Sequence, residues 1–301
     1  MSFAAGVRQE LCRQAVGRRC CAVAEAFGVL LYANAFTPDT VRVVTENADF
    51  AARLPRIFRR AFGLGFDAVP EEGGRTGKLI FTISDQEKIA RIFEAFGFSA
   101  AQHISLHVNF GILEEECCRV SFLRGAFLAG GSVTDPAKRY HLELSTAHRK
   151  VGGETEALLL DLGFRPKALS RGGVSILYFK QSDAIEDLLT LLGAPVAAMA
   201  VMEAKVEKEL RNGVNRRVNC DTANLTKVVD AAQEQIAAIR RLERRGALAE
   251  LPDKLRATAA LRLENPEATL AELAEMQDPP VSKSAMNHRL RKLLELAGKA
   301  P

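Results

Sequence analysis

The chain has 301 residues, of which 48% are hydrophobic and 26% charged, and its formal net charge is +4 at pH 7. This composition is ordinary for globular proteins and excludes a chain that is too polar to bury a core. The length suits two or three domains. The small positive charge is compatible with a polyanionic partner but does not demand one, so the local distribution of charge must decide.

Residues 1–21 contain no apolar run long enough for a signal peptide, because Arg18 and Arg19 interrupt it. No stretch of the chain approaches the roughly 20 apolar residues of a membrane span. We therefore expect a protein of the reducing cytoplasm that has no membrane partner.

The six cysteines are Cys12, Cys20, Cys21, Cys117, Cys118 and Cys220. They include two adjacent pairs and no C-x-x-C spacing, so the pattern indicates neither a zinc site nor a disulfide framework. We expect reduced, mostly buried thiols, no metal and no cofactor. His103 and His107 have the i, i+4 spacing of a helical metal pair, but no third ligand follows them, which favours a structural or solvent-facing role.

Two segments of the chain, residues 22–97 and 119–193, carry the same pattern. When AFGVLLYANAFT is placed beneath LRGAFLAGGSVT, Gly28 aligns with Gly125. In each copy an opening helix leads to an alternating strand, a second helix, a further strand and a closing helix capped by glycine. The repeat predicts a duplicated α+β domain over residues 1–197, with two αββαββα-type units about a pseudo-twofold axis.

Small residues are concentrated in the opening helix of the second copy, FLRGAFLAGGSV at 122–133. Glycine inside a helix costs about 1 kcal/mol relative to alanine, so several glycines within two turns need a compensating reason. The repeat supplies one, because the two opening helices would lie on the pseudo-twofold axis with their backbones in close approach.

After Gly193 the pattern changes to helices only. Residues 198–216 are typical of a charged helix that loses order near Asn212 and Gly213, so we assign residues 198–220 to a linker helix. A long amphipathic helix follows, whose apolar face consists of Leu225, Val228, Val229, Ala232, Ile236 and Ile239.

Residues 221–301 are predicted to form a C-terminal helix-turn-helix domain. Thr269 and Glu272 form a capping box that opens a short helix, and Ser282 is a natural N-cap for a second helix after the interruption DPPV. A short helix, a tight turn and a second helix are the order of a DNA-binding helix-turn-helix, in which the second helix enters the major groove.

The second helix of this motif separates an apolar face from a cationic one. Its inward stripe consists of Met286, Leu290, Leu293 and Ala297. The residues predicted to bind double-stranded DNA point elsewhere and are Lys283, Ser284, Asn287, His288, Arg291 and Lys292. Asn287 can pair with adenine and Arg291 with guanine, whereas the lysines suit phosphates. The alternative is a polar face on a helix that only packs.

The stretch LRGAFLAGGSV at 123–133 resembles the LAGLIDADG motif of homing endonucleases. The resemblance implies a duplicated fold with two motif helices at its centre. In the enzymes it also implies nuclease activity, for which the acidic residue just before the final glycine of the motif binds a divalent metal. That position falls on Ala33 in the first copy and on Gly130 in the second, and neither residue can ligate a metal. Asp39 and Asp135 lie a few residues on, beside prolines, where turn chemistry favours a structural role. We therefore expect no catalytic residue and no enzyme.

A LAGLIDADG-like body without its acids, joined to a C-terminal helix-turn-helix, resembles the bacterial WhiA family over nearly the whole chain. The most specific phrases are FLRGAFLAGGSV, NRRVNCDTANLTK at 215–227 and PPVSKSAMNHRLRKL at 279–293. The resemblance implies a sequence-specific DNA-binding regulator of transcription in Gram-positive bacteria, tied to sporulation septation in some members and to cell division or chromosome segregation in others.

Two other functions stay open. One is an active, metal-dependent LAGLIDADG-type endonuclease with displaced ligands, for which Asp39 and Asp135 are the candidates. The other is an interaction protein, in which the LAGLIDADG-like domain recruits another protein and contact with DNA is incidental.

Overall fold

The computed structural model describes residues 2–70, 77–98 and 105–299. The chain divides into two compact units, Met1–Lys208 and Glu209–Pro301, and each unit has its own hydrophobic core. The division falls inside the region 198–220 for which the sequence predicts a linker.

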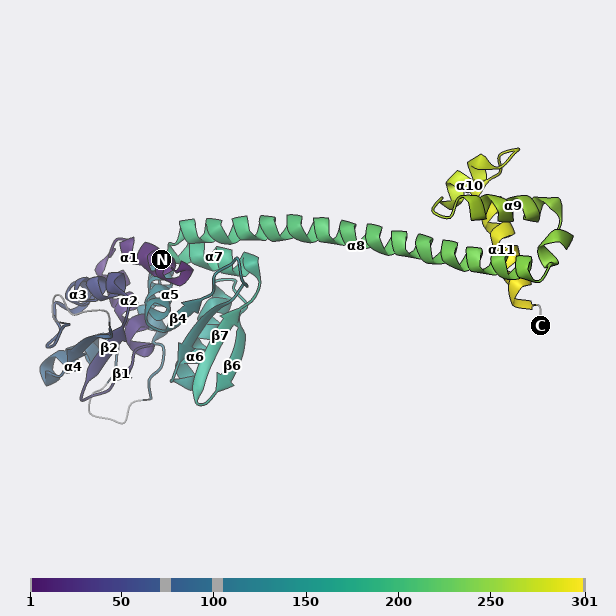
Figure 1. The fold of residues 1–301 in the computed structure, drawn as a ribbon. Coiled ribbons are helices and arrows are strands. Elements are labelled where there is room, and N and C mark those ends of the chain that lie inside the picture. Colours follow the sequence, from purple (N-terminus) through teal and green to yellow (C-terminus); the bar gives the residue numbers. More distant parts are fainter. Residues whose placement is uncertain (1, 71–76, 99–104, 300–301) are drawn as a thin grey trace. The chain divides into compact units, whose positions relative to one another are not determined.

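In the first unit, an N-terminal helix precedes two halves whose elements correspond in order, apart from one additional strand in the second half (Figure 1). The N-terminal helix is α1 (Phe3–Arg13). The first half consists of α2 (Arg19–Leu31), β1 (Ala35–Phe36), β2 (Val41–Thr45), α3 (Ala48–Phe62), β3 (Leu79–Ile83) and α4 (Gln86–Ala95). The second half, after a 3-10 turn at Phe110–Ile112, consists of α5 (Glu116–Gly130), β4 (Gly131–Val133), β5 (Leu142–Thr146), α6 (Arg149–Asp161), β6 (Lys167–Arg171), β7 (Val174–Phe179) and α7 (Ser182–Leu192). This order confirms the duplicated LAGLIDADG-like α+β fold.

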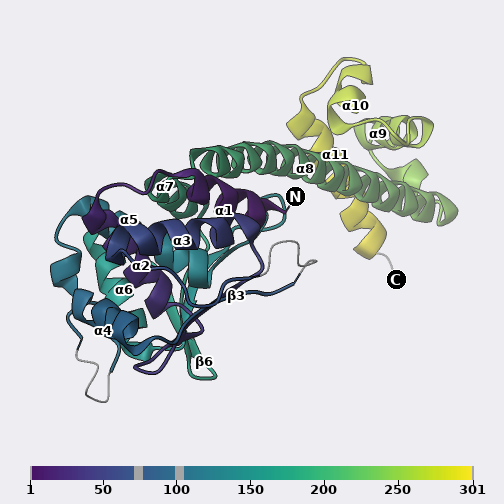
Figure 2. The ribbon, with the colours of Figure 1, turned by 90° about the vertical axis from the view of Figure 1, so that its left-hand side faces the viewer.

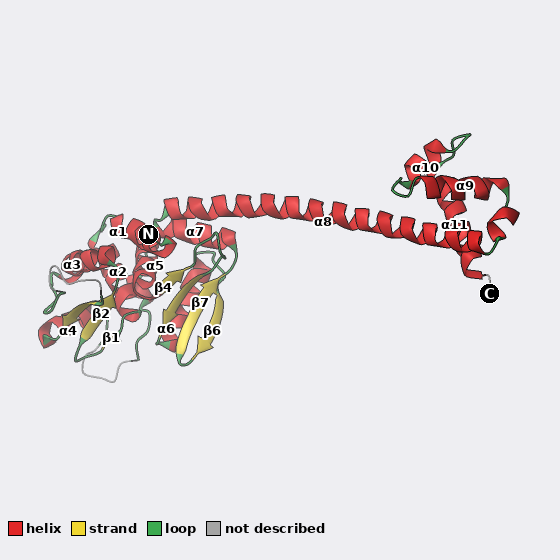
Figure 3. Cartoon of the chain, in the orientation of Figure 1, coloured by secondary structure: helices red, strands yellow, loops and turns green. Residues whose placement is uncertain are grey.

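Each half has one antiparallel sheet (Figure 3). The strand orders are β1-β2-β3 in the first half and β4-β5-β7-β6 in the second. In the first half Val43 lies opposite Phe81, and in the second Leu144 lies opposite Leu177, with all four side chains buried. The strand β6 has only an isolated bridge, Ala68 to Thr82, as its counterpart in the described part of the first half.

The helices α2 and α5 form a central helix pair in which the backbones touch at two glycines. A Cβ atom added to Gly28 would lie 2.0 Å from the carbonyl oxygen of Phe122, and one added to Gly125 would lie 2.1 Å from that of Glu25. Such distances are far shorter than any allowed contact, so only glycine fits at either position. The predicted close approach of the two opening helices is therefore confirmed, and the packing accounts for glycine inside both helices.

The central helix pair also surrounds a buried charge. The Glu25 side chain on α2 is only 2% exposed, and its Oε1 atom lies 2.6 Å from Nε of Arg53 on α3. Arg124 of α5 lies farther away, with Nη1 4.0 Å from Oε2 of Glu25. Because a buried carboxylate needs compensation, these arginines of the two halves make its burial tolerable.

Helix α1 ties the two halves together. It lies alongside α3 (Figures 1 and 2), and its side chains reach the second half. Arg8 donates a 2.5 Å hydrogen bond to the carbonyl of Gly131, and Gln14 donates one of 2.8 Å to the carbonyl of Gly193. Both carbonyls belong to residues at ends of helices, where the backbone lacks intrahelical partners.

The helix α8 (Pro195–Arg244) is continuous, so the predicted loss of order near Asn212 and Gly213 is wrong. A single glycine costs a helix only about 1 kcal/mol, and strong helix formers such as Glu209 and Leu210 precede it. The apolar face predicted on this helix packs only toward its C-terminal end: Ala232 and Ile239 are buried, whereas Leu225 is exposed.

Among its described residues, the second unit contains helices and the connections between them, and no strand. After α8 it contains a 3-10 turn (Ala247–Glu250), α9 (Asp253–Glu264), α10 (Leu270–Met276) and α11 (Lys283–Lys299). Its core consists of Ala238, Ile239, Leu242, Ala259, Leu273, Ala274, Met286, Leu290, Leu293 and Ala297. The C-terminal end of α8 therefore packs with the three short helices.

All six cysteines are free, but only Cys12 and Cys118 are buried, so the expectation of mostly buried thiols is wrong.

Within the described part of the chain, every helix is too short or too polar to span a lipid bilayer.

We expect Gly28→Ala to destabilise the protein by at least about 2 kcal/mol, because the methyl group would force apart two backbones that touch. The control is Gly153→Ala in α6, whose added Cβ meets nothing within 4 Å and which should be neutral or stabilising by up to about 1 kcal/mol. Urea unfolding followed by circular dichroism measures both changes. Equal stabilities of the two variants would contradict the close approach.

Candidate DNA-binding interface

The helix α10 begins at the predicted capping box. The Glu272 N–H donates to Oγ1 of Thr269 over 3.3 Å, and the Thr269 N–H donates to Oε2 of Glu272 over 2.7 Å. The second bond holds the pKa of the Glu272 carboxyl below its usual range. The reciprocal bonds satisfy two backbone donors and set the first residue of a helix of only two turns.

The connection from α10 to α11 runs over residues 277–282, longer than the tight turn expected from the sequence. The Val281 N–H donates to the carbonyl of Ala274 over 3.0 Å, which folds the connection back on α10. Ser282 accepts a 3.1 Å hydrogen bond from the Ala285 N–H, so its predicted role as N-cap is confirmed. Arg289 of α11 donates to Gln277 over 3.5 Å and links α11 to the end of α10.

A buried arginine holds the connection between α9 and α10. Arg262 is 2% exposed, and its Nη1 atom donates to the carbonyls of Ala268 over 2.7 Å and of Asn265 over 3.3 Å. Burial lowers the pKa of this guanidinium. No pattern in the sequence identifies this residue, because only the tertiary packing turns its side chain toward these carbonyls.

The two faces of α11 differ as the sequence predicts. The inward stripe is buried and consists of Met286, Leu290, Leu293 and Ala297. Of the six predicted DNA-binding residues, Asn287 is half-buried, and the exposed ones are Lys283, Ser284, His288, Arg291 and Lys292. Asn287 and Arg291, one turn apart, are therefore both accessible on the face that does not pack.

The accessible face of α11 is cationic. Lys283 lies in the first turn, Arg291 and Lys292 lie two turns further on, and the acid Glu295 contacts Lys292 with 3.7 Å between Nζ and Oε2. This pair is half exposed, so it fixes the lysine only weakly. Cationic side chains flanking Asn287 form an arrangement in which phosphates and a base edge can be contacted at once.

At the C-terminal ends of the central helix pair, the motif positions cannot carry ligands. A Cβ atom on Gly130 would lie 2.5 Å from the carbonyl oxygen of Ser145 and 2.8 Å from Cδ1 of Tyr32. Ala33, its counterpart, follows the end of α2. An acidic side chain at Gly130 would require the surrounding backbone to move, because the buried Tyr32 ring takes up this space.

The other candidate metal ligands do not come together. Asp135 accepts a hydrogen bond from the Ala137 N–H over 2.9 Å, which confirms the predicted turn, and Asp39 is exposed in a bend. His107 lies outside any helix and packs edge-on against Phe98 with 4.9 Å between ring centroids, whereas His103 lies outside the described residues. In the described part of the chain, the only group of three or more possible ligand side chains is one of cysteines.

Two family models match the chain. The WhiA LAGLIDADG-like domain matches residues 119–211, and the WhiA C-terminal HTH domain matches residues 214–297. The second match covers α9, α10 and α11 as well as the C-terminal part of α8. It identifies these helices as a helix-turn-helix domain, as the sequence predicts.

Curated relatives match over the whole chain. "Probable cell division protein WhiA" of Ruminiclostridium cellulolyticum is 40% identical over 304 residues, which cover 99% of this chain and 97% of that protein. The protein of the same name from Alkaliphilus metalliredigens is 35% identical, over 99% of this chain and 98% of that protein. The crystal structure of full-length DUF199/WhiA from Thermotoga maritima has a TM-score of 0.60 at 22% identity, and covers 100% of this chain and 99% of that one. This last likeness supports the fold alone.

Proposed function

The chain belongs to the WhiA family, and from this premise we propose that it is a sequence-specific DNA-binding protein that regulates transcription and serves cell division. The relatives' printed name, probable cell division protein, supports the biological role. The helix-turn-helix domain supports the biochemical one, since that motif places its second helix in the major groove.

The observation that carries the proposal is the exposed cationic face of α11. Ser284, Asn287, His288 and Arg291 would read bases, and Lys283 and Lys292 would contact phosphates. Met286 and Leu290, on the opposite face, are fully buried, so the domain core holds α11 while its polar side chains stay free to enter duplex DNA.

In this proposal the LAGLIDADG-like unit has no nuclease activity and serves as a scaffold, a binding surface for another protein or a second surface for DNA. The C-terminal ends of the central helix pair support the lack of nuclease activity. Cleavage through a divalent metal needs oxygen ligands at these positions, and the side chains of Gly130 and Ala33 have no oxygen. We propose no cofactor for DNA binding.

We expect Asn287→Ala and Arg291→Ala each to cost about 1–3 kcal/mol of binding to the cognate site and to relax the preference for one base pair. Lys283→Ala should instead weaken binding to all sequences and reduce the slope of log affinity against log salt by about one. Fluorescence anisotropy with cognate and scrambled duplexes measures both effects. Lys254→Ala, an exposed lysine of α9, is the control and should leave the base preference unchanged.

The fragment 209–301 should retain most of the affinity for DNA, because it contains α11 and a complete core of its own. Gel-shift titration of the fragment, of the full chain and of residues 1–208 compares the three. Affinity that stays with residues 1–208 would favour the interaction-protein alternative or a DNA surface on the first unit.

Incubation of the full chain with Mg²⁺ or Mn²⁺ should leave supercoiled plasmid and cognate duplex uncut. Nicking that requires the metal and disappears in Asp39→Asn or Asp135→Asn would establish the endonuclease alternative instead. A contaminating nuclease would cut equally in both variants, which makes them the matched control.

A further inference from the structure

The two adjacent cysteine pairs occupy equivalent positions in the two halves. Cys20 precedes Gly28 by the same eight residues that separate Cys117 from Gly125, so Cys20 corresponds to Cys117 and Cys21 to Cys118. Because the glycines mark the contact of α2 with α5, each pair lies at the N-terminal end of one helix of the central helix pair.

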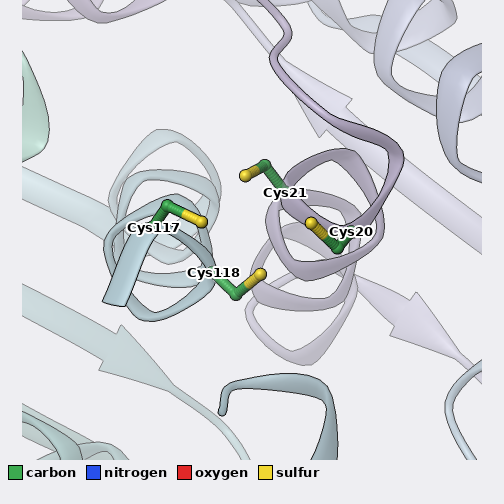
Figure 4. Close-up of side chains that lie close together, drawn as sticks. All are labelled: Cys20, Cys21, Cys117 and Cys118. Carbon is green, nitrogen blue, oxygen red and sulfur yellow. The ribbon is translucent and has the colours of Figure 1, made fainter. Parts of the chain in front are cut away.

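This arrangement brings all four sulfur atoms together. The Sγ atoms of Cys20, Cys21, Cys117 and Cys118 lie within 4.8 Å of one another, and they point into the space between the two helices (Figure 4). The sulfur atoms of each half therefore lie close to those of the other half, as a pseudo-twofold relation requires.

The spacing suits one tetrahedral ion. With zinc–sulfur bonds of about 2.3 Å, four thiolates around zinc lie about 3.8 Å from one another, so the observed separations exceed that geometry by no more than about 1 Å. Small side-chain rotations can supply such a change. An iron–sulfur cluster spreads its four thiolates over several metal and sulfide atoms and needs wider separations than these.

The surroundings can offset the charge of such a centre. Four thiolates around a divalent ion carry a net charge of −2, and the Arg18 guanidinium lies 3.9 Å from Sγ of Cys117. Cys20 and Cys117 lie in the first turns of α2 and α5, where the helix dipole favours a thiolate. Arg124 lines the same surface hollow as Cys21, although its guanidinium also lies 4.0 Å from the carboxylate of Glu25.

A divalent ion is bound by thiolates and not by thiols, so binding at this cluster would release protons and would weaken at low pH.

An ion can reach the cluster from solvent. Cys20 is exposed and lines one surface hollow together with Arg19 and Arg91. Cys21 and Cys117 line another. The buried Cys118 would be the innermost ligand.

We propose that Cys20, Cys21, Cys117 and Cys118 form a structural zinc site that joins the N-terminal ends of α2 and α5. The site clamps the two halves where Gly28 and Gly125 already hold the helices in contact. It is independent of the proposed DNA binding, and its ligands precede the segments that the two family models match.

Full-length protein purified under reducing conditions should contain about one zinc ion per chain by mass spectrometry of its metals. The thiol reagent p-chloromercuribenzoate should release that ion. Exchange with Co²⁺ should give the visible absorption of tetrahedral cobalt and the ultraviolet band of thiolate-to-cobalt charge transfer. These measurements need no variant, so they test the proposal even where a substitution prevents folding.

Cys20→Ser and Cys117→Ser should each weaken zinc binding by at least about tenfold in competition with a chelating dye. The matched controls Cys220→Ser, an exposed thiol of α8, and Cys12→Ser, a buried one, should retain the metal. A strong chelator should lower the urea midpoint of the unmodified protein and of both controls, but not that of Cys20→Ser/Cys117→Ser.

Three results would overturn the proposal. The first is reduced protein that contains no stoichiometric zinc and gives no thiolate–cobalt spectrum. The second is zinc that stays bound when all four cysteines are replaced by serine. The third is protein alkylated at cell lysis that shows disulfides joining Cys20 to Cys118 and Cys21 to Cys117, which would make the cluster a pair of covalent bonds.

Discussion

The first unit depends on the contact between the backbones of α2 and α5. Each carbonyl oxygen that faces a glycine across this contact occupies space that any side chain would need. The two helices can therefore serve as one shared core for both halves, and nearly every side chain in the middle of α2 is buried. The sheets and the outer helices lie on either side of this helix pair. Helix α1 joins the halves through hydrogen bonds that its side of the chain donates to carbonyls of the second half.

The same proximity determines what each end of the central helix pair can hold. At the C-terminal ends, Tyr32 and the Ser145 carbonyl fill the space next to Gly130, so an acidic side chain has no room there. At the N-terminal ends the helices carry small thiols, and four of these meet. The side chains that could bind a metal therefore lie at the N-terminal ends of the central helix pair, where the zinc site is proposed.

The second unit has a core of its own, and this core leaves the polar face of α11 uncovered. Leu273 of α10 and Met286 and Leu290 of α11 belong to the same buried core, and Arg262 fixes the preceding connection through backbone carbonyls. These interactions leave the cationic side of α11 without packing partners in the core. Under the proposed function, this support would hold the side chains of α11 in position to contact DNA bases.

The sequence by itself determined the repeat, the glycine contact, the capping box at Thr269, the N-cap at Ser282 and the two faces of α11, because each depends on residues close in the chain or on a periodic pattern. It did not determine the continuity of α8 through Gly213, since a local helix breaker is outweighed by its helix-forming neighbours. It also missed the meeting of the cysteines, although the equal distances of both pairs from the aligned glycines were a usable signal. Only the tertiary structure decided that meeting, together with the burial of Arg262 and Glu25, because side chains far apart in sequence become neighbours only when the helices pack.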